Sequence, residues 1–191
     1  MVVDGVRVTK PVRTATELLR RRERDTAVMA IDGALRMGHV ALDAIADKLE
    51  QMVREPGIRR AWTAFVCLDP NAGAITESKA RLIMWDRKIY PLTQVPLPGE
   101  NGKIYFADAV AEGVVFESEG FAYHGDDEAH EADARRFNEV ASAARGSGLD
   151  FCRLTYKALF YRTKQTGDLM VRTIAARKRR LSRTPDALDV S

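Results

Sequence analysis

The sequence predicts an α+β protein in which a small helical subdomain (residues 1–68) precedes a domain with a central mixed sheet flanked by helices (residues 69–183). In the first 68 residues, apolar side chains recur mostly at the i, i+3, i+4 spacing of short amphipathic helices. After the turn-forming segment 69–73, the expected order is helix, three strands, helix, strand, helix, which is typical of helices packed on a small sheet. Residues 184–191 are expected to form a flexible tail.

The elements of the helical subdomain follow from capping and spacing. Residues 2–8 alternate around Gly5 and predict a strand or hairpin end. Thr14 followed by Glu17 matches a capping box, so the first helix is expected over residues 15–24. Apolar spacing predicts three further helices, around residues 27–38, 42–49 and 58–66.

The second domain begins with a predicted helix at residues 78–87 and a short extended piece at 94–97. Glu112 and Gly113 have the composition of a two-residue hairpin turn between strands at 103–110 and 113–119. A polar loop (124–133), a helix (132–145), a strand (151–155) and a helix (159–181) interrupted near Gly167 are expected to complete the domain.

Composition excludes several classes of protein. No apolar run approaches the ~18 residues that span a bilayer, and the first 20 residues lack a signal-peptide core, so we expect a cytoplasmic protein without membrane attachment. Cys67 and Cys152 are far apart and match no zinc-binding spacing, so reduced thiols are expected. Charge is unevenly distributed: residues 66–150 hold 15 acidic and 8 basic side chains, and residues 151–191 hold 3 and 10. An acidic middle with basic ends fits a solvated surface, or carboxylates gathered for a metal beside basic arms for a polyanion.

The predicted hairpin brings carboxylates together. A turn at residues 112–113 places Asp108 opposite Glu117, where Cβ atoms are ~4.5–5.5 Å apart. Glu119 shares the face of Glu117 because side chains alternate along a strand. Three converging carboxylates can bind Mg²⁺ or Mn²⁺, and such an ion lowers the pKa of a bound water and polarises a phosphoryl oxygen. The alternative is a face whose carboxylates point at water, and a register slip of one residue would move Asp108 to the other face.

These residues also resemble a nuclease family. Asp108 followed by Glu117-Ser118-Glu119 resembles the D…(D/E)xK signature of the PD-(D/E)XK superfamily. Residues 114–124 (VVFESEGFAYH) are similar to very-short-patch-repair (Vsr-like) endonucleases and their bacterial relatives, which carry V-E-x-D-G and then a His, here His124. Three further segments are similar to those relatives, a helix opening at 77–82 (ESKARL), a basic helix at 136–138 (RFN) and a strand at 152–155 (CRLT).

The N-terminal segment resembles a second group. Residues 2–15 (VVDGVRVTKPVRTA) are similar to a segment of actinobacterial AbiEi antitoxin-like proteins. In those proteins a winged-helix domain comes first, followed by this segment, helices and a Vsr-like domain. By this resemblance, which covers residues 2 to about 180, the chain begins where the winged helix would end.

The resemblance implies a divergent metal-dependent DNA endonuclease. Asp108, Glu117 and Glu119 would hold Mg²⁺ or Mn²⁺, Glu77 would support them, and His124 would assist proton transfer. Glu119 replaces the signature lysine, where the Vsr-like relatives usually have Asp, which leaves open whether the domain cleaves DNA or only binds it. The basic residues predicted to contact DNA are Arg136, Arg153, Arg177, Lys178, Arg179 and Arg180. The last four are equally typical of a solvated helix end.

Two alternatives belong to other classes of function. The first is a non-catalytic DNA-binding or regulatory module of a toxin–antitoxin or phage-defence system, with a protein partner. The second is a protein-interaction domain whose acidic surface binds a partner.

Overall fold

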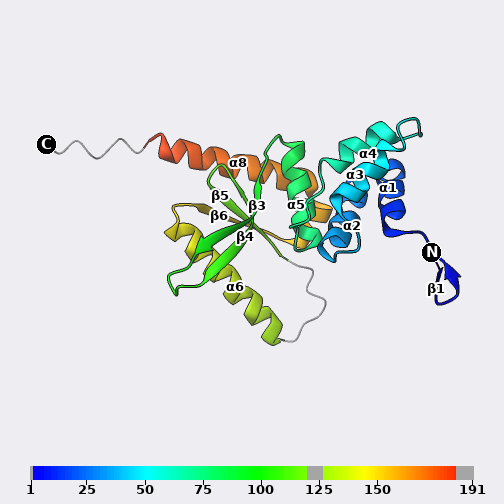
Figure 1. Cartoon of the computed structure of the whole chain (residues 1–191). Coiled ribbons are helices and arrows are strands. Elements are labelled where there is room, and N and C mark those ends of the chain that lie inside the picture. Colours follow the sequence, from blue (N-terminus) through cyan, green and yellow to red (C-terminus); the bar gives the residue numbers. More distant parts are fainter. Residues whose placement is uncertain (1, 120–126, 184–191) are drawn as a thin grey trace. The chain divides into compact units, whose positions relative to one another are not determined.

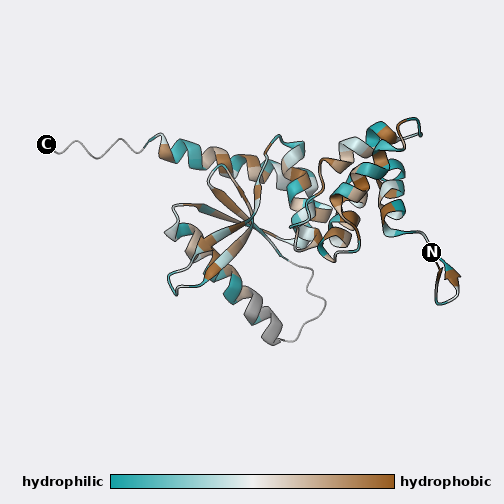
Figure 2. Cartoon of the chain, viewed as in Figure 1, coloured by the Kyte–Doolittle hydropathy of each residue, from teal (hydrophilic) through white to brown (hydrophobic). Residues whose placement is uncertain are grey.

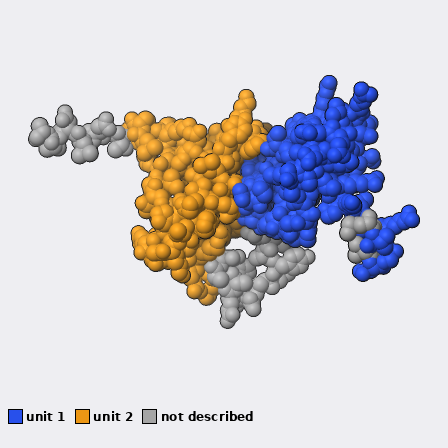
Figure 3. All heavy atoms as spheres, in the orientation of Figure 1, with its two compact units in different colours: residues 1–82 blue, residues 83–191 orange. Residues whose placement is uncertain are grey.

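The computed structural model describes residues 2–119 and 127–183, which form eight helices and six strands (Figure 1). The predicted α+β fold is confirmed, because helices flank a four-stranded sheet of mixed strand direction. The chain divides into two compact units, residues 1–82 and 83–191 (Figure 3).

The first unit is mostly helical. A small hairpin, β1 (Val2–Val3) and β2 (Val6–Arg7), turns at Asp4 and Gly5, which both have positive φ as a tight hairpin turn requires. Four helices follow: α1 (Pro11–Arg21), α2 (Arg24–Arg36), α3 (Leu42–Glu50) and α4 (Ile58–Phe65). Each helix contributes buried apolar residues to the core of this unit, among them Leu19, Ile31, Ile45, Leu49 and Ala61.

Helix α1 begins earlier than predicted. Pro11 occupies its first turn, where the missing N–H of proline would have no partner in any case, and Lys10 is the extended N-cap. Thr14 lies inside the helix and its hydroxyl donates to the Lys10 carbonyl (3.4 Å). Glu17 forms an ion pair with Arg20 (3.1 Å). The capping box predicted at Thr14 and Glu17 was therefore wrong.

A buried polar network joins α2 to the start of α5 (Ile75–Asp86). The Asp32 carboxylate, which is 1% exposed, accepts hydrogen bonds from Asp69 N (2.8 Å), Ser78 Oγ (2.7 Å) and Arg81 Nη2 (2.5 Å). Arg81 also donates to the Cys67 carbonyl. Burial raises the pKa of Asp32, although these donors favour its charged form. The network fixes the first turns of α5 to the helices that precede it.

The network agrees with the position at which the two units divide. The division falls after Leu82, inside α5, whereas the sequence places the break at residue 69. Ser78 and Arg81 lie beyond that break, yet both bind a residue of α2. The predicted domain boundaries themselves stay a prediction.

The second unit is built on the sheet β3-β4-β5-β6. Its strands are β3 (Leu92–Pro98), β4 (Ile104–Ala111), β5 (Val114–Ser118) and β6 (Asp150–Leu154). The first three are antiparallel neighbours, and β6 runs parallel to β5. Its helices are α6 (Asp127–Gly146), α7 (Tyr156–Tyr161) and α8 (Thr163–Leu181).

Helices cover both faces of this sheet, with α6 on one side and α8 on the other (Figure 1). The strands are coloured largely brown in Figure 2, because most of their residues are hydrophobic. The core between the sheet and α6 is made of Leu97, Ala107, Val115, Val140, Ala143 and Ala144. This packing holds α6 against the strands that carry the predicted acids.

Two predicted helix limits in this unit were wrong. Helix α6 begins at Asp127, inside the segment predicted as a loop. The break in the C-terminal helix lies at Arg162 and not at Gly167. The hydroxyls of Thr163 and Thr166 donate to carbonyls in the last turn of α7, and so provide partners that a continued helix would otherwise supply. Gly167 lies within α8, where an added Cβ would come 2.8 Å from the guanidinium carbon of Arg87.

Within residues 2–119 and 127–183, none of the helices combines the length and the apolar character needed to cross a membrane.

Candidate functional site

The predicted acids lie where β4 and β5 part. The hairpin turns at Glu112 and Gly113, both with positive φ, and pairs Ala109 with Phe116. This is the register predicted from the sequence. Beyond that pair, β4 continues to pair only with β3, and β5 only with β6. Asp108 is the next residue on β4 at this fork.

At the fork, where β4 and β5 no longer pair through their backbones, hydrogen bonds to side chains connect the two strands. The Asp108 backbone N–H donates to Glu117 Oε2 (3.2 Å). The Ser118 backbone N–H and hydroxyl both donate to Asp108 Oδ2 (2.8 Å each). Asp108 and Glu117, which we call the acid pair, are therefore fixed by the backbones of each other's strands. Their side chains are 7% and 0% exposed.

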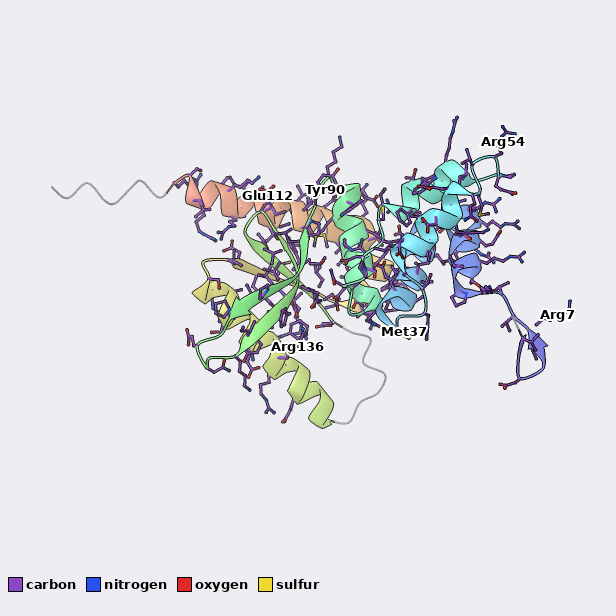
Figure 4. All side chains as sticks on the ribbon, viewed as in Figure 1. Arg7, Met37, Arg54, Tyr90, Glu112 and Arg136 are labelled. Carbon is purple, nitrogen blue, oxygen red and sulfur yellow. The ribbon has the colours of Figure 1, made fainter. Side chains whose placement is uncertain are left out.

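Arg136 of α6 (labelled in Figure 4) bridges the acid pair. Its Nη2 lies 2.9 Å from Glu117 Oε1 and 3.8 Å from Asp108 Oδ1. One cationic nitrogen thus faces one oxygen of each carboxylate, and the other oxygens take hydrogen bonds within the fork. The Arg136 side chain is 49% exposed, so the cation is at the surface and the anions are not.

The pKa of Asp108 is raised above its usual range. The largest cause is burial, which penalises the carboxylate. The hydrogen bonds from Ser118 and the charge of Arg136 act in the opposite direction, because they favour the ionised form. Because burial is the largest cause, the ionised form of Asp108 is disfavoured, and the Ser118 hydrogen bonds and the charge of Arg136 offset this only in part.

Glu119 lies just outside the fork and has a different partner. It forms an ion pair with Arg153 of β6, and its backbone N–H donates to the Leu154 carbonyl (2.8 Å). The guanidinium carbon of Arg153 also lies 4.1 Å from the centre of the Phe137 ring, a cation–π contact. Three residues that matched the Vsr-like pattern are thus in contact, but Glu119 faces an arginine rather than the acid pair.

Glu77 belongs to the first unit, and His124 lies outside the described residues. Glu77 stands in the first turn of α5, in the first unit, and its Oε2 accepts a hydrogen bond from Gly73 N (2.7 Å). An acid in that position stabilises a helix start. His124 lies outside the described residues, and the roles predicted for both side chains stay predictions.

Some basic residues of α8 form ion pairs within the second unit, and others are exposed at its surface. Arg177 and Arg180 both pair with Asp150 Oδ1 (3.2 and 2.5 Å), and Arg177 also donates to the Gly148 carbonyl (2.8 Å). Lys178 pairs with Glu112 in the hairpin turn (2.9 Å). Arg179 is exposed, and with Ala176, Arg180 and Arg183 it lines a shallow hollow of about 370 Å³.

The acid pair suits a hard divalent cation. Mg²⁺ is commonly held by one or two carboxylates while water and substrate phosphates complete its coordination. Asp108 Oδ1 and Glu117 Oε1 face one point, which the Arg136 nitrogen takes in this structure. Among the described residues, no three His, Cys, Asp or Glu side chains are grouped closely enough to hold a metal. The donor set therefore fits two carboxylates, and Glu119 as a third ligand stays a prediction.

The roles of two residues were not predicted, those of Ser118 in the fork and of Asp32 in the first unit. Ser118 fixes Asp108 from the neighbouring strand, and its only signal is its place between the two acids. Asp32 binds Ser78 and Arg81 of the ESKARL segment, which gives that segment a structural role. Its signal was available, because Asp32 follows Val28 by four residues on the apolar face of its helix, an unusual position for an unpaired acid.

Comparisons with known proteins give relatives without a known function. The uncharacterized proteins MT2308 and Rv2248 of Mycobacterium tuberculosis are each 32% identical to this chain over 107 residues. The alignment covers 56% of this chain and 40% of each relative, so the chain spans less than half the length of these curated relatives. No family model matches the chain, and no solved structure is significantly similar to it.

Proposed function

We propose that this chain is a metal-dependent phosphodiesterase of the endonuclease type, acting on DNA. The observation that carries the proposal is the convergence of Asp108 Oδ1 and Glu117 Oε1 on a single cation position at the fork of two strands. A site of this kind binds Mg²⁺ or Mn²⁺ through hard oxygen atoms. The resemblance of the hairpin sequence to Vsr-like nucleases adds to the proposal.

The residues of the fork have distinct roles in this proposal. Asp108 and Glu117 hold the divalent ion, which when bound supplies Lewis-acid activation of a phosphodiester and of water. Ser118 holds Asp108 Oδ2 with two hydrogen bonds, and the Asp108 N–H holds Glu117 Oε2, so neither carboxylate can rotate without losing a partner. Such preorganisation keeps the two inward oxygens at a fixed separation.

Exposed arginines on the second unit support DNA as the substrate class. Arg179 and Arg183 line the hollow on α8, and arginines at a surface contact phosphates without reading sequence. Arg136 and Arg153 are about half exposed on the elements that carry or adjoin the acids. A polyanion that reaches the acid pair would meet these cations.

A second candidate is the non-catalytic DNA-binding or regulatory module, in a toxin–antitoxin or phage-defence setting. The observation that favours it is that an arginine already contacts each predicted metal ligand: Arg136 contacts Asp108 and Glu117, and Arg153 contacts Glu119. In this candidate the ion pairs are structural and no metal is needed.

Plasmid nicking with Mg²⁺ or Mn²⁺ separates the two candidates. Wild type, Asp108→Asn and Glu117→Gln are compared with Glu112→Gln, an exposed acid of the same hairpin that lies in its turn. Metal-dependent nicking that Glu112→Gln retains and the other two variants lose supports the phosphodiesterase. Salt-sensitive DNA binding without nicking supports the binding module. If neither DNA nor metal interacts, both candidates fail and the protein-interaction domain becomes the leading alternative.

A further inference from the structure

We infer that Arg136 is the resident counter-ion of the acid pair, and that a divalent cation binds Asp108 and Glu117 only by displacing its guanidinium. This inference rests on the proposed function and adds that Arg136 and the metal ion compete for the same carboxylate oxygens. It predicts that removing one arginine strengthens metal binding, although the arginine is not itself a ligand.

The contacts show that the arginine and a metal ion need the same atoms. In each carboxylate one oxygen is held within the fork, by Ser118 or by the Asp108 N–H. The remaining oxygens, Asp108 Oδ1 and Glu117 Oε1, are the two that face Arg136 Nη2. A Mg²⁺ ion sits about 2.0–2.1 Å from its oxygen ligands. An ion at that distance from Glu117 Oε1 would stand against a guanidinium only 2.9 Å from the same oxygen.

Charge gives the competition its direction. The acid pair holds two carboxyl groups with almost no exposure to water, and when both are ionised one guanidinium compensates for only one charge. Removing a carboxylate from water is costly unless a cation replaces the lost hydration. A dication matches the pair better than Arg136 does, so exchange is favourable once the arginine has an alternative.

The arginine has that alternative in solvent. Its side chain is 49% exposed, so it can rotate from the fork into water without unpacking α6. The core contacts of α6 come from Val140, Ala143 and Ala144, which lie further along the helix. The acids cannot move in the same way, because the backbones of β4 and β5 hold them. Displacement of Arg136 is therefore the change that opens the site.

A purely structural arginine would behave differently. If Arg136 only neutralises the acids, its removal destabilises the second unit, and divalent cations do not restore the loss. If it competes with a cation, its removal also leaves two buried carboxylates facing a vacant position. A divalent ion would then bind there more tightly and recover the stability, since a ligand that binds only the folded state stabilises it.

The test compares Arg136→Met with Arg135→Met, the neighbouring exposed arginine on α6. Mn²⁺ affinity is measured by titration calorimetry and the melting temperature with and without Mn²⁺. We expect Arg136→Met to melt below wild type without metal, to regain that loss with saturating Mn²⁺, and to bind Mn²⁺ about tenfold or more tightly, since a charge-assisted contact no longer has to be broken. Arg135→Met should match wild type in all three measurements.

Each outcome bears on a different claim. Equal Mn²⁺ affinity in wild type and Arg136→Met overturns the competition and leaves the proposed function standing. Binding that Asp108→Asn does not reduce also overturns it, because the ion then sits elsewhere. If wild type and Arg136→Met both fail to bind Mn²⁺, the metal-dependent function fails and the inference fails with it. Should Arg136→Met not fold, Arg136→Lys keeps the charge with a weaker grip, and Mn²⁺ affinity no higher than wild type in that variant overturns the inference.

Discussion

Replacing Asp32 with alanine tests whether the buried network of the first unit holds α5 in place. The change removes the acceptor for two buried donors, Ser78 Oγ and Arg81 Nη2, and for the half-buried Asp69 N. Each buried donor left without an acceptor costs about 1–3 kcal/mol. We therefore expect Asp32→Ala to lower the free energy of unfolding by about 3–5 kcal/mol, close to the largest values seen for single substitutions.

The assay is urea denaturation followed by far-UV circular dichroism, with a thermal melt as a second measurement. A loss of about 3 kcal/mol corresponds to at least about 6 °C in a chain of this size. Asp32→Asn keeps the shape and one acceptor oxygen, so it should lose only about 1 kcal/mol. Asp47→Ala, an exposed acid of α3, is the matched control and should change stability by less than about 0.5 kcal/mol. An Asp32→Ala protein within about 1 kcal/mol of wild type would refute the role assigned to the network.

Three further predictions follow from single sites. Burial raises the folded-state pKa of Asp32 above its ordinary value of 3.8. The stability that protonated Asp32 contributes is therefore fully present below pH 3.8 and is lost as the pH rises through the folded-state pKa. Asn does not titrate, so the stability of Asp32→Asn relative to wild type should increase from acid to neutral pH, as measured by urea denaturation at each pH. Gly57→Ala should cost about 1–3 kcal/mol more than Gly38→Ala in thermal melts. Both glycines have positive φ, but only at Gly57 would a Cβ meet a backbone oxygen of α1, at 2.6 Å. Arg179→Gln with Arg183→Gln should reduce the slope of log affinity for DNA against log salt by about 1.8, as measured by fluorescence anisotropy, and an unchanged slope would remove α8 from the interface.

The turn and the register of the hairpin between β4 and β5 could be predicted from local sequence rules. Glu112 and Gly113 form the two-residue turn, and such a turn fixes the register, so the pairing of Ala109 with Phe116 followed from it. The start of α1 at Pro11 could also have been predicted, because proline is common in a first helical turn. Thr14 and Glu17 matched a capping box in sequence, but both lie inside the helix.

Tertiary contacts account for what the sequence did not predict. The parting of β4 and β5 depends on each strand pairing with a different neighbour, which no spacing within the hairpin reveals. Arg136 reaches the acid pair from a helix, because α6 packs across the sheet. The break at Arg162 depends on two threonine hydroxyls, while Gly167 was a misleading signal since it makes room for Arg87.

The ion pairs of α8 reduce the positive charge that this helix exposes to other molecules. Asp150 holds Arg177 and Arg180, and Glu112 holds Lys178. Much of the positive field that composition suggests for this helix is therefore cancelled within the fold. What remains outward is a small electropositive spot rather than a long basic track, which favours brief, easily reversed encounters with a nucleic acid over tight wrapping.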